Sequence, residues 1–176
     1  MEKQYTQQQN LTFLLIRYLS LVCLMFILPI IYLILKPLTV YVSSFLLSLF
    51  YTVYTVKDYI IINNVPIQIV SSCVAGSAYL LLLILNLSLP LSTKKRFFSL
   101  LLSIFVLFVI NVLRIVLFSM LYTNNFKYFI LTHNFTWYFL STLFVVLIWI
   151  LTTKLFKIKS IPIYSDLKSL LRLAKK

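Results

Sequence analysis

Apolar residues dominate five long stretches of the chain, and each stretch is near the length of a membrane-spanning helix. About 20 mostly apolar residues cross the hydrocarbon core of a bilayer as a helix. The pattern predicts spans at Leu11–Leu35, Leu38–Tyr54, Cys73–Leu91, Phe97–Tyr122 and Phe135–Thr153. Lys36-Pro37 separates the first two, and Pro fits the opening turn of a new helix. The second stretch is short, so a tilted or half-inserted segment is the alternative there.

Two smaller elements complete the predicted fold, an all-α polytopic membrane protein with about five transmembrane helices. In Tyr59–Val70, two β-rich runs flank Asn63-Asn64, which predicts a short extracytoplasmic hairpin. In the tail, leucines alternate with cations, which predicts an amphipathic helix on the cytoplasmic leaflet. We therefore expect one transmembrane domain over residues 1–155, with its core at about 59–155, and a basic tail over 156–176.

The composition supports a membrane protein and excludes several other classes. Of the 176 residues, 62% are hydrophobic and 11% are charged, and the mean hydropathy is +1.02. A soluble domain is roughly 45–50% apolar and about 25% charged, and a disordered chain is poor in apolar residues. Two Cys cannot build a disulfide scaffold. One His, two distant Cys and three acids are too few for a metal site, and we expect no cofactor.

The net charge of +13 could indicate nucleic acid, but the positions of the cations favour a membrane. Most of them lie in the Lys94–Arg96 loop and from Lys154 onward, which is the positive-inside pattern of cytoplasmic segments. We therefore expect no nucleic-acid partner. The loops Thr55–Ser72 and Thr123–Asn134 are predicted to lie outside, and with five spans the N-terminus would lie outside too. The first apolar stretch is too long for a signal peptide and lacks its basic start, so we expect a retained span.

Two polar residues fall inside the fourth predicted span. Arg114 lies about 17 residues after Phe97, or roughly 25 Å along a helix, in the outer leaflet. An Arg there costs several kcal/mol unless it is paired or reaches the headgroups. Asn111 lies one turn earlier on the same face. Arg114 is thus either an active-site cation held by its neighbours or an arginine that reaches the outer headgroups.

Cys73 and His133 are the two other candidate reactive residues. Cys73 opens the third predicted span among small residues, where a helix N-terminus favours the thiolate, whereas Cys23 is surrounded by apolar residues in mid-span. The alternative for the small residues around Cys73 is helix packing alone. His133 is the only His and lies at the entrance to the fifth span on the outer side, and imidazole exchanges protons near neutral pH. Its alternative is a place in an interfacial aromatic belt.

The three residues together indicate a catalytic site more strongly than any one of them. They fall on three different predicted helices near the outer surface and supply a nucleophile, a cation and a proton carrier. The predicted catalytic residues are Cys73, Arg114 and His133. The predicted supporting residues are Asn111, Gly76, Ser72 and Asn134.

At these residues the sequence resembles the exosortase/archaeosortase family of membrane transpeptidases, and most of all its short archaeal-type branch. The resemblance covers about Tyr59 to Leu155 and rests on a Cys in a small-residue run, an N-x-x-R-I pattern and a downstream His. The pattern reads Asn111-Val112-Leu113-Arg114-Ile115. The chain departs from many members, which have a Gly two residues after the Cys, because Gly76 comes third here.

The resemblance implies a role for each residue and a class of substrate. Cys73 would attack a peptide bond and form a thioester, Arg114 would stabilise the thiolate or oxyanion, and His133 would move protons. The substrates would be surface proteins with a C-terminal motif, span and basic cluster, and a membrane lipid would be the acceptor. The enzyme would lie in the cell membrane, with its site outside and its C-terminus in the cytoplasm. A non-enzymatic assembly factor or small transporter is the alternative, although transporters usually place polar groups near the bilayer midplane.

Overall fold

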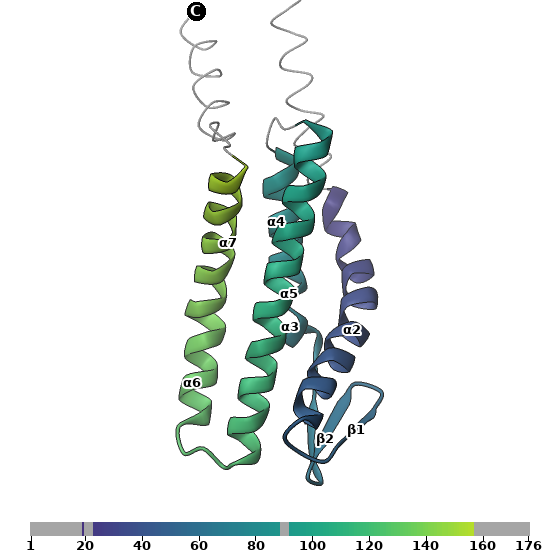
Figure 1. The fold of residues 1–176 in the computed structure, drawn as a ribbon, viewed down its shortest axis with the longest axis vertical. Helices are drawn as coiled ribbons and strands as arrows, with labels where there is room; N and C mark the ends of the chain where they lie inside the picture. Colours follow the sequence, from purple (N-terminus) through teal and green to yellow (C-terminus); the bar gives the residue numbers. More distant parts are fainter. Residues whose placement is uncertain (1–18, 20–22, 89–91, 157–176) are drawn as a thin grey trace, which may run out of the picture.

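The computed structural model describes residue 19 and residues 23–88 and 92–156, which form a helical bundle with a small sheet at one end (Figure 1). Three helices are long and apolar enough to cross a membrane: Met25–Ser48, Thr93–Thr123 and Phe129–Leu155. A shorter apolar helix, α4 (Gly76–Ser88), packs among them. The predicted helical character is therefore confirmed, whereas the purely α class is not, because the described residues include three strands. The predicted amphipathic helix of the tail and the start of the first predicted span lie outside the described residues.

The first long helix corrects the prediction of two spans around Lys36-Pro37. A short 3₁₀ segment, η1 (Leu24–Ile27), leads into α2 (Leu28–Ser48), which continues through Pro37. Pro37 removes one interior hydrogen bond, but α2 packs along α4 and α5, and these contacts hold the helix on both sides of it. Because residues 28–48 form one helix rather than parts of two, the span count that put the N-terminus outside loses its basis.

The predicted hairpin is confirmed and belongs to a three-stranded antiparallel sheet. Its order is β1 (Val53–Val56), β2 (Tyr59–Ile62) and β3 (Val65–Gln68). Asn63 and Asn64 connect β2 to β3 with φ of 48° and 68°, as a two-residue type I′ turn requires. The second predicted span was wrong at its end, because Tyr54 lies in β1.

Packing against α2 fixes the position of the sheet. Ile60 and Ile62 of β2 are fully buried and join Val40 and Leu47 of α2 in one hydrophobic cluster. An ion pair also joins Lys36 of α2 to Asp58 in the β1–β2 turn. The sheet is therefore anchored to the bundle rather than being a free extension of it.

The third predicted span is interrupted near its start. A single helical turn, α3 (Ser71–Val74), ends at Ala75, which has a left-handed backbone with φ of 60°, and α4 begins at Gly76. A Cβ on Gly76 would lie 2.5 Å from the ring of Tyr32 in α2. The small residue thus permits the close approach of α2 to the interrupted segment.

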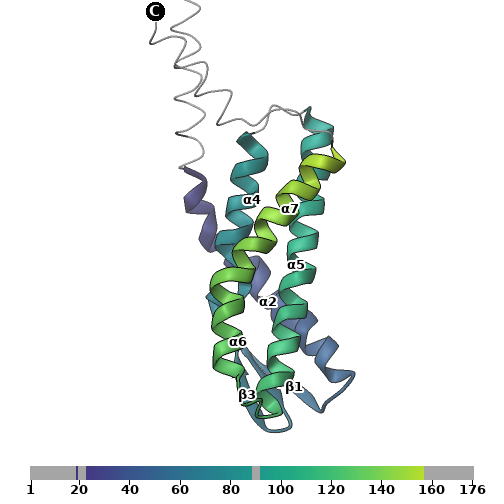
Figure 2. The ribbon, with the colours of Figure 1, turned by 90° about the vertical axis from the view of Figure 1, so that its left-hand side faces the viewer.

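The last two long helices pack side by side and form a helical hairpin (Figure 2). The prediction for Phe97–Tyr122 is confirmed by α5 (Thr93–Thr123). The other helix begins at Phe129 rather than Phe135 and comprises α6 (Phe129–Phe135), a π-helical turn η2 (Thr136–Leu140) and α7 (Ser141–Leu155). His133 therefore lies within α6 rather than at the entrance of a helix.

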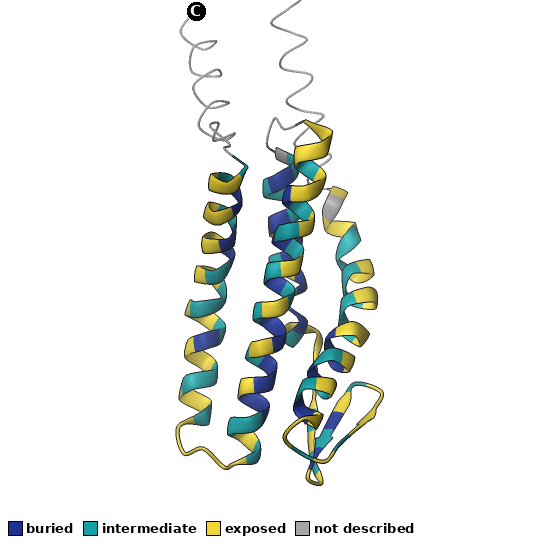
Figure 3. Ribbon diagram, viewed as in Figure 1, coloured by how far each residue is buried: buried dark blue, intermediate teal, exposed yellow. Residues whose placement is uncertain are grey.

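The two ends of the bundle differ in charge, and its outer faces are apolar. The start of α5, which carries Lys94–Arg96, and the end of α7, which carries Lys154, lie at one end, and the sheet lies at the other (Figure 1). The outward faces of the helices expose large apolar side chains such as Phe105, Leu113 and Leu147 (Figure 3). Such faces are compatible with contact to lipid chains.

Candidate active site

The site is built around the interruption between α3 and α4. Ala75 leaves the helical conformation. The carbonyls of Cys73 and Val74 therefore do not accept the backbone hydrogen bonds that they would accept in a continuous helix. The buried side chain of Asn111 on α5 satisfies both of them. Its Nδ2 donates to the Cys73 carbonyl at 2.9 Å and to the Val74 carbonyl at 3.3 Å. Asn111 therefore holds the interrupted backbone in place.

Arg114 connects α5 to both neighbouring segments. Its Nη2 donates to the Cys73 carbonyl at 3.3 Å and its Nη1 donates to Ser141 Oγ at 2.8 Å. Ser141 Oγ in turn donates to the carbonyl of Thr136 at 3.1 Å, across the π-helical turn. The half-buried guanidinium thus joins the interruption after α3 to a second backbone irregularity.

No carboxylate neutralises Arg114 within the part of the chain that the structure describes. The one acidic residue there is Asp58, and it pairs with Lys36. A guanidinium has five N–H donors, and the two bonds of Arg114 leave donors for a further acceptor. A half-buried cation with neutral partners and spare donors suits a site where negative charge develops.

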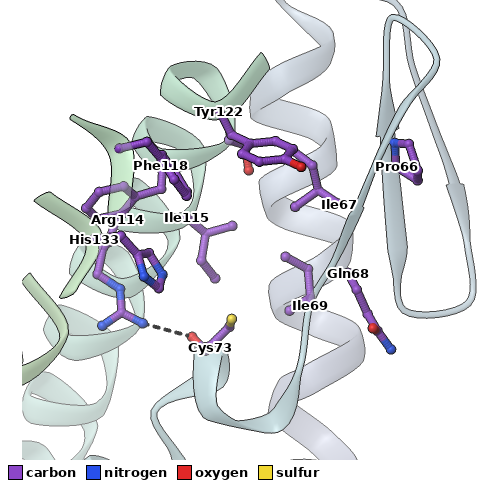
Figure 4. Close-up of a pocket in the computed structure, with 12 residues that line it drawn as sticks. Pro66, Ile67, Gln68, Ile69, Cys73, Arg114, Ile115, Phe118, Tyr122 and His133 are labelled. Carbon is purple, nitrogen blue, oxygen red and sulfur yellow. Dashed lines mark hydrogen bonds between the residues drawn. The ribbon is translucent and has the colours of Figure 1, made fainter. Parts of the chain in front are cut away.

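Cys73, Arg114 and His133 line one cavity of about 330 Å³ between β3, α3, α5 and α6 (Figure 4). The sulfur of Cys73 points into this cavity, and the guanidinium of Arg114 lies beside the backbone of Cys73 (Figure 4). The structure therefore brings the three predicted catalytic residues together from three segments. Residues of α5 and α6 complete one wall: Ile115, Phe118, Ser119, Tyr122 and Phe129.

Aromatic rings hold His133 in position. Its ring centre lies 5.2 Å from that of Phe118, 5.6 Å from that of Phe129 and 6.0 Å from that of Trp137. Among the described residues, no side chain or backbone group forms a hydrogen bond with the imidazole. The ring is thus oriented by packing, and its nitrogens can exchange a proton with a group bound in the cavity.

The other predicted supporting residues lie outside this cavity. Ser72 is exposed and lines a second cavity of about 330 Å³, between the α3–α4 segment and α7, which shares Arg114 as part of its wall. Gly76 contacts Tyr32, as described above. Asn134 is exposed and lines neither cavity. None of the three forms a hydrogen bond with the sulfur of Cys73, and their predicted supporting role stays a prediction.

The structure corrects the prediction that Cys73 lies at the N-terminus of a long helix. The sequence indicated the first residue of a long helix, but Cys73 is the third residue of a four-residue turn. The left-handed residue after Val74 separates this turn from α4, so the long helix does not begin at the thiol. Arg114 is instead the charged group beside Cys73, and its Nη2 donates to the Cys73 carbonyl.

Sequence reasoning missed two parts of the site. Ser141, which accepts from Arg114, was hidden in the fifth apolar stretch, and its only signal was a hydroxyl in a run of apolar residues. Residues of β3 also line the cavity, whereas the sequence predicted only that the hairpin comes directly before Cys73. Within the described ranges, no three His, Cys, Asp or Glu side chains are close enough to hold a metal ion.

Comparison of the chain with models of known protein families, with curated proteins and with solved structures finds no match. The geometry of the cavity and the motifs that line it are therefore the basis for assigning a function.

Proposed function

We propose that the protein is a membrane-embedded cysteine transpeptidase or protease of the exosortase/archaeosortase type. The observation that carries the proposal is the interruption after α3. The interruption lies directly after Cys73, and Cys73 lines one cavity together with Arg114 and His133. Irregular backbone is tolerated among membrane helices where it is buried or lines a cavity. Two side chains of α5 are used to hold this irregular segment, and the segment carries the one nucleophilic thiol of the cavity.

In the proposed acylation step, Cys73 attacks the carbonyl carbon of a peptide bond. The thiol proton passes to the imidazole of His133, and a new C–S bond forms. The carbonyl oxygen becomes an oxyanion, which accepts hydrogen bonds from the unused N–H groups of Arg114. The C–N bond then breaks, His133 returns the proton to the leaving amine, and a thioester remains on Cys73.

In the second step, a nucleophile resolves the thioester. A water molecule, or a hydroxyl or amino group of a lipid, attacks the thioester carbon and gives its proton to His133. The C–S bond breaks, and the proton returns to the sulfur of Cys73. Water releases a carboxylic acid, whereas a lipid nucleophile leaves the protein attached through an ester or an amide. The same acyl-enzyme serves both outcomes.

The proposed substrates are surface proteins that end in a short motif, an apolar span and a basic cluster. In this proposal α2, α4, α5 and the α6–α7 helix lie in the cell membrane, with Lys94–Arg96 and Lys154 on the cytoplasmic side. The sheet and the cavity then face the outside, where the substrate presents its motif. The substrate's span can lie beside the exposed apolar faces of the bundle.

Replacing Cys73 tests this function. We expect Cys73→Ala to abolish tail removal from a co-expressed surface protein with such a C-terminal signal, measured as a mobility shift, because no thioester can form. Cys23→Ala is the matched control, since Cys23 is the other free cysteine of the described residues and does not line the cavity. Equal abundance of both variants in the membrane excludes misfolding. Tail removal by Cys73→Ala at the wild-type level would refute the proposal.

A further inference from the structure

β3 is an edge strand of the sheet. Among the described residues, the strand order places β2 on one side of it and no strand on the other. In antiparallel pairs, the backbone groups of alternate residues point toward the partner strand. The N–H of Ile69 donates to the Asp58 carbonyl at 2.9 Å, so the alternate residues Val65 and Ile67 also direct their N–H and C=O groups toward β2. The backbone groups of Pro66 and Gln68 therefore point away from the sheet.

The cavity extends along this free edge. Four consecutive residues line it: Pro66, Ile67, Gln68 and Ile69. A strand that presented only one face to a cavity would line it with alternate residues. The side chains of Ile67 and Ile69 point into the cavity, whereas those of Pro66 and Gln68 point away from it (Figure 4). Pro66 and Gln68 thus border the cavity through their backbone, which is the unpaired edge of β3.

Three backbone groups remain open at this edge. They are the C=O of Pro66 and the N–H and C=O of Gln68, and none forms a hydrogen bond within the described part of the chain. Pro66 has no N–H, and a proline on an edge strand limits pairing with other chains. The edge can therefore bind one short extended segment, in contrast to the long open edges that cause aggregation.

We propose that the substrate residues on the amino side of the cleaved bond bind as a short fourth strand on β3. The inference rests on the proposed function, and it adds how the peptide is recognised. An extended peptide would exchange hydrogen bonds with Gln68 and donate one to Pro66, as in recognition by strand addition. The strand leads through Ile69 and Val70 into α3, so a peptide bound along it is guided to Cys73.

The walls of the cavity indicate which side chains such a peptide carries. Ile67 and Ile69 line the cavity from β3 and the residue that follows it, and Phe118, Tyr122 and Phe129 line it from α5 and α6. In strand addition, hydrogen bonds to the main chain provide affinity, and pockets for alternate side chains provide specificity. The site thus favours an extended peptide with an apolar residue at alternate positions near the cleaved bond.

Alkylation of Cys73 by two chloromethyl ketones tests this binding mode on the full chain in lipid nanodiscs. One probe is a capped tetrapeptide library with mixed side chains, and the other is a capped single amino acid. In both reactions a C–S bond replaces the C–Cl bond, chloride leaves, and the thiol proton is released. Mass spectrometry measures the rate at Cys73. We expect the tetrapeptides to react at least about tenfold faster, because only they can pair with β3.

Two variants at Gln68 separate its backbone from its side chain. Gln68→Pro removes the outward N–H, and we expect it to reduce the tetrapeptide advantage roughly three- to tenfold, which is the net contribution of one hydrogen bond. Gln68→Ala keeps the N–H and removes the side chain, and its rate should stay within about twofold of the wild type. The single amino acid should react at the same rate with all three proteins, which shows that the cavity is intact.

A set of modified peptides makes the test independent of protein variants. Tetrapeptides methylated at one amide nitrogen at a time should react more slowly with the wild type only when the methylated N–H is one that faces β3. Equal rates for tetrapeptides and the single amino acid, or no methylation that slows the reaction more than about twofold, would overturn binding on β3. Either result would leave the proposed chemistry standing, because Cys73→Ala tests that separately.

Discussion

Two sets of polar side chains inside the bundle, one near the sheet and one near the opposite end, bond to different kinds of partner. Near the sheet, Asn111 and Arg114 of α5 donate to the carbonyl of Cys73. The backbone there is interrupted at Ala75, and the polar side chains replace hydrogen bonds that a continuous helix would have made. Polar groups in this region therefore stabilise an irregular segment that carries a thiol.

The other set joins regular helices to one another. Asn86 of α4 donates to Ser99 Oγ at 2.6 Å, and Ser103 Oγ lies 3.0 Å from Thr152 Oγ1 of α7. Because each hydroxyl has one hydrogen, one of these two hydroxyls donates to the other, which in turn donates to the carbonyl four residues earlier in its own helix. None of the four residues lines either of the two cavities. Such contacts are typical of helix packing in membranes. A buried polar residue thus indicates a site when it supports irregular backbone, and indicates packing when its helices are regular.

The largest loss of activity is expected at Arg114, in the set of polar side chains near the sheet. Arg114→Ala removes the cation, the oxyanion donors and the link between Cys73 and Ser141, so tail removal should fall by at least about a hundredfold. Arg114→Lys should recover less than about a tenth of the activity, because an ammonium cannot bond two partners in the planar geometry of a guanidinium. Rates come from a time course of the mobility shift.

Lys95→Ala is the control for this experiment. It removes one cation from the exposed start of the same helix, and tail removal should remain unchanged. If Arg114→Ala processes the substrate as fast as Lys95→Ala does, the bonds of Arg114 to Cys73 and Ser141 serve the structure alone, and Arg114 has no part in the reaction.

A smaller loss of activity is expected when Asn111 is replaced, whose side-chain amide bonds to the carbonyls before the interruption. Asn111→Leu keeps the size of the side chain and leaves the Val74 carbonyl without its partner, which costs about 1–3 kcal/mol. The midpoint of thermal unfolding should fall by several degrees, and tail removal should fall about tenfold because Cys73 is less well positioned. A variant with lower thermal stability and full activity per folded molecule would show that Asn111 serves stability alone.

The sequence predicted the helices of the bundle well where an apolar run coincided with one regular helix. Phe97–Tyr122 became α5, and Asn63-Asn64 became the turn of a hairpin. It failed at Lys36-Pro37, because contacts of α2 with α4 and α5 outweigh the missing hydrogen bond of one proline. It also missed β1, because a strand that follows an apolar helix without a break in hydropathy looks like its continuation.

The candidate reactive residues were easier to predict than the backbone features that position them. The thiol of Cys73, the cation of Arg114 and the imidazole of His133 stood out because they lie within or at the ends of apolar stretches, and they line one cavity. The left-handed conformation of Ala75 had no sequence signal, since Gly is the residue that usually adopts it. The open edge of β3 depends on the order of strands in three dimensions, which the order of residues does not reveal.

The smallest effect is expected at the end opposite to the sheet, from the same substitution that is damaging at Asn111. Asn86→Leu removes the bond to Ser99, but the Ser99 hydroxyl can donate to a carbonyl of its own helix. The change also removes a buried amide oxygen that has no partner, so the free energy of unfolding should change by less than about 1 kcal/mol. Thermal unfolding and tail removal are measured beside Asn111→Leu. A loss of activity equal to that of Asn111→Leu would place this network in the function as well, since packing alone predicts no effect on the reaction.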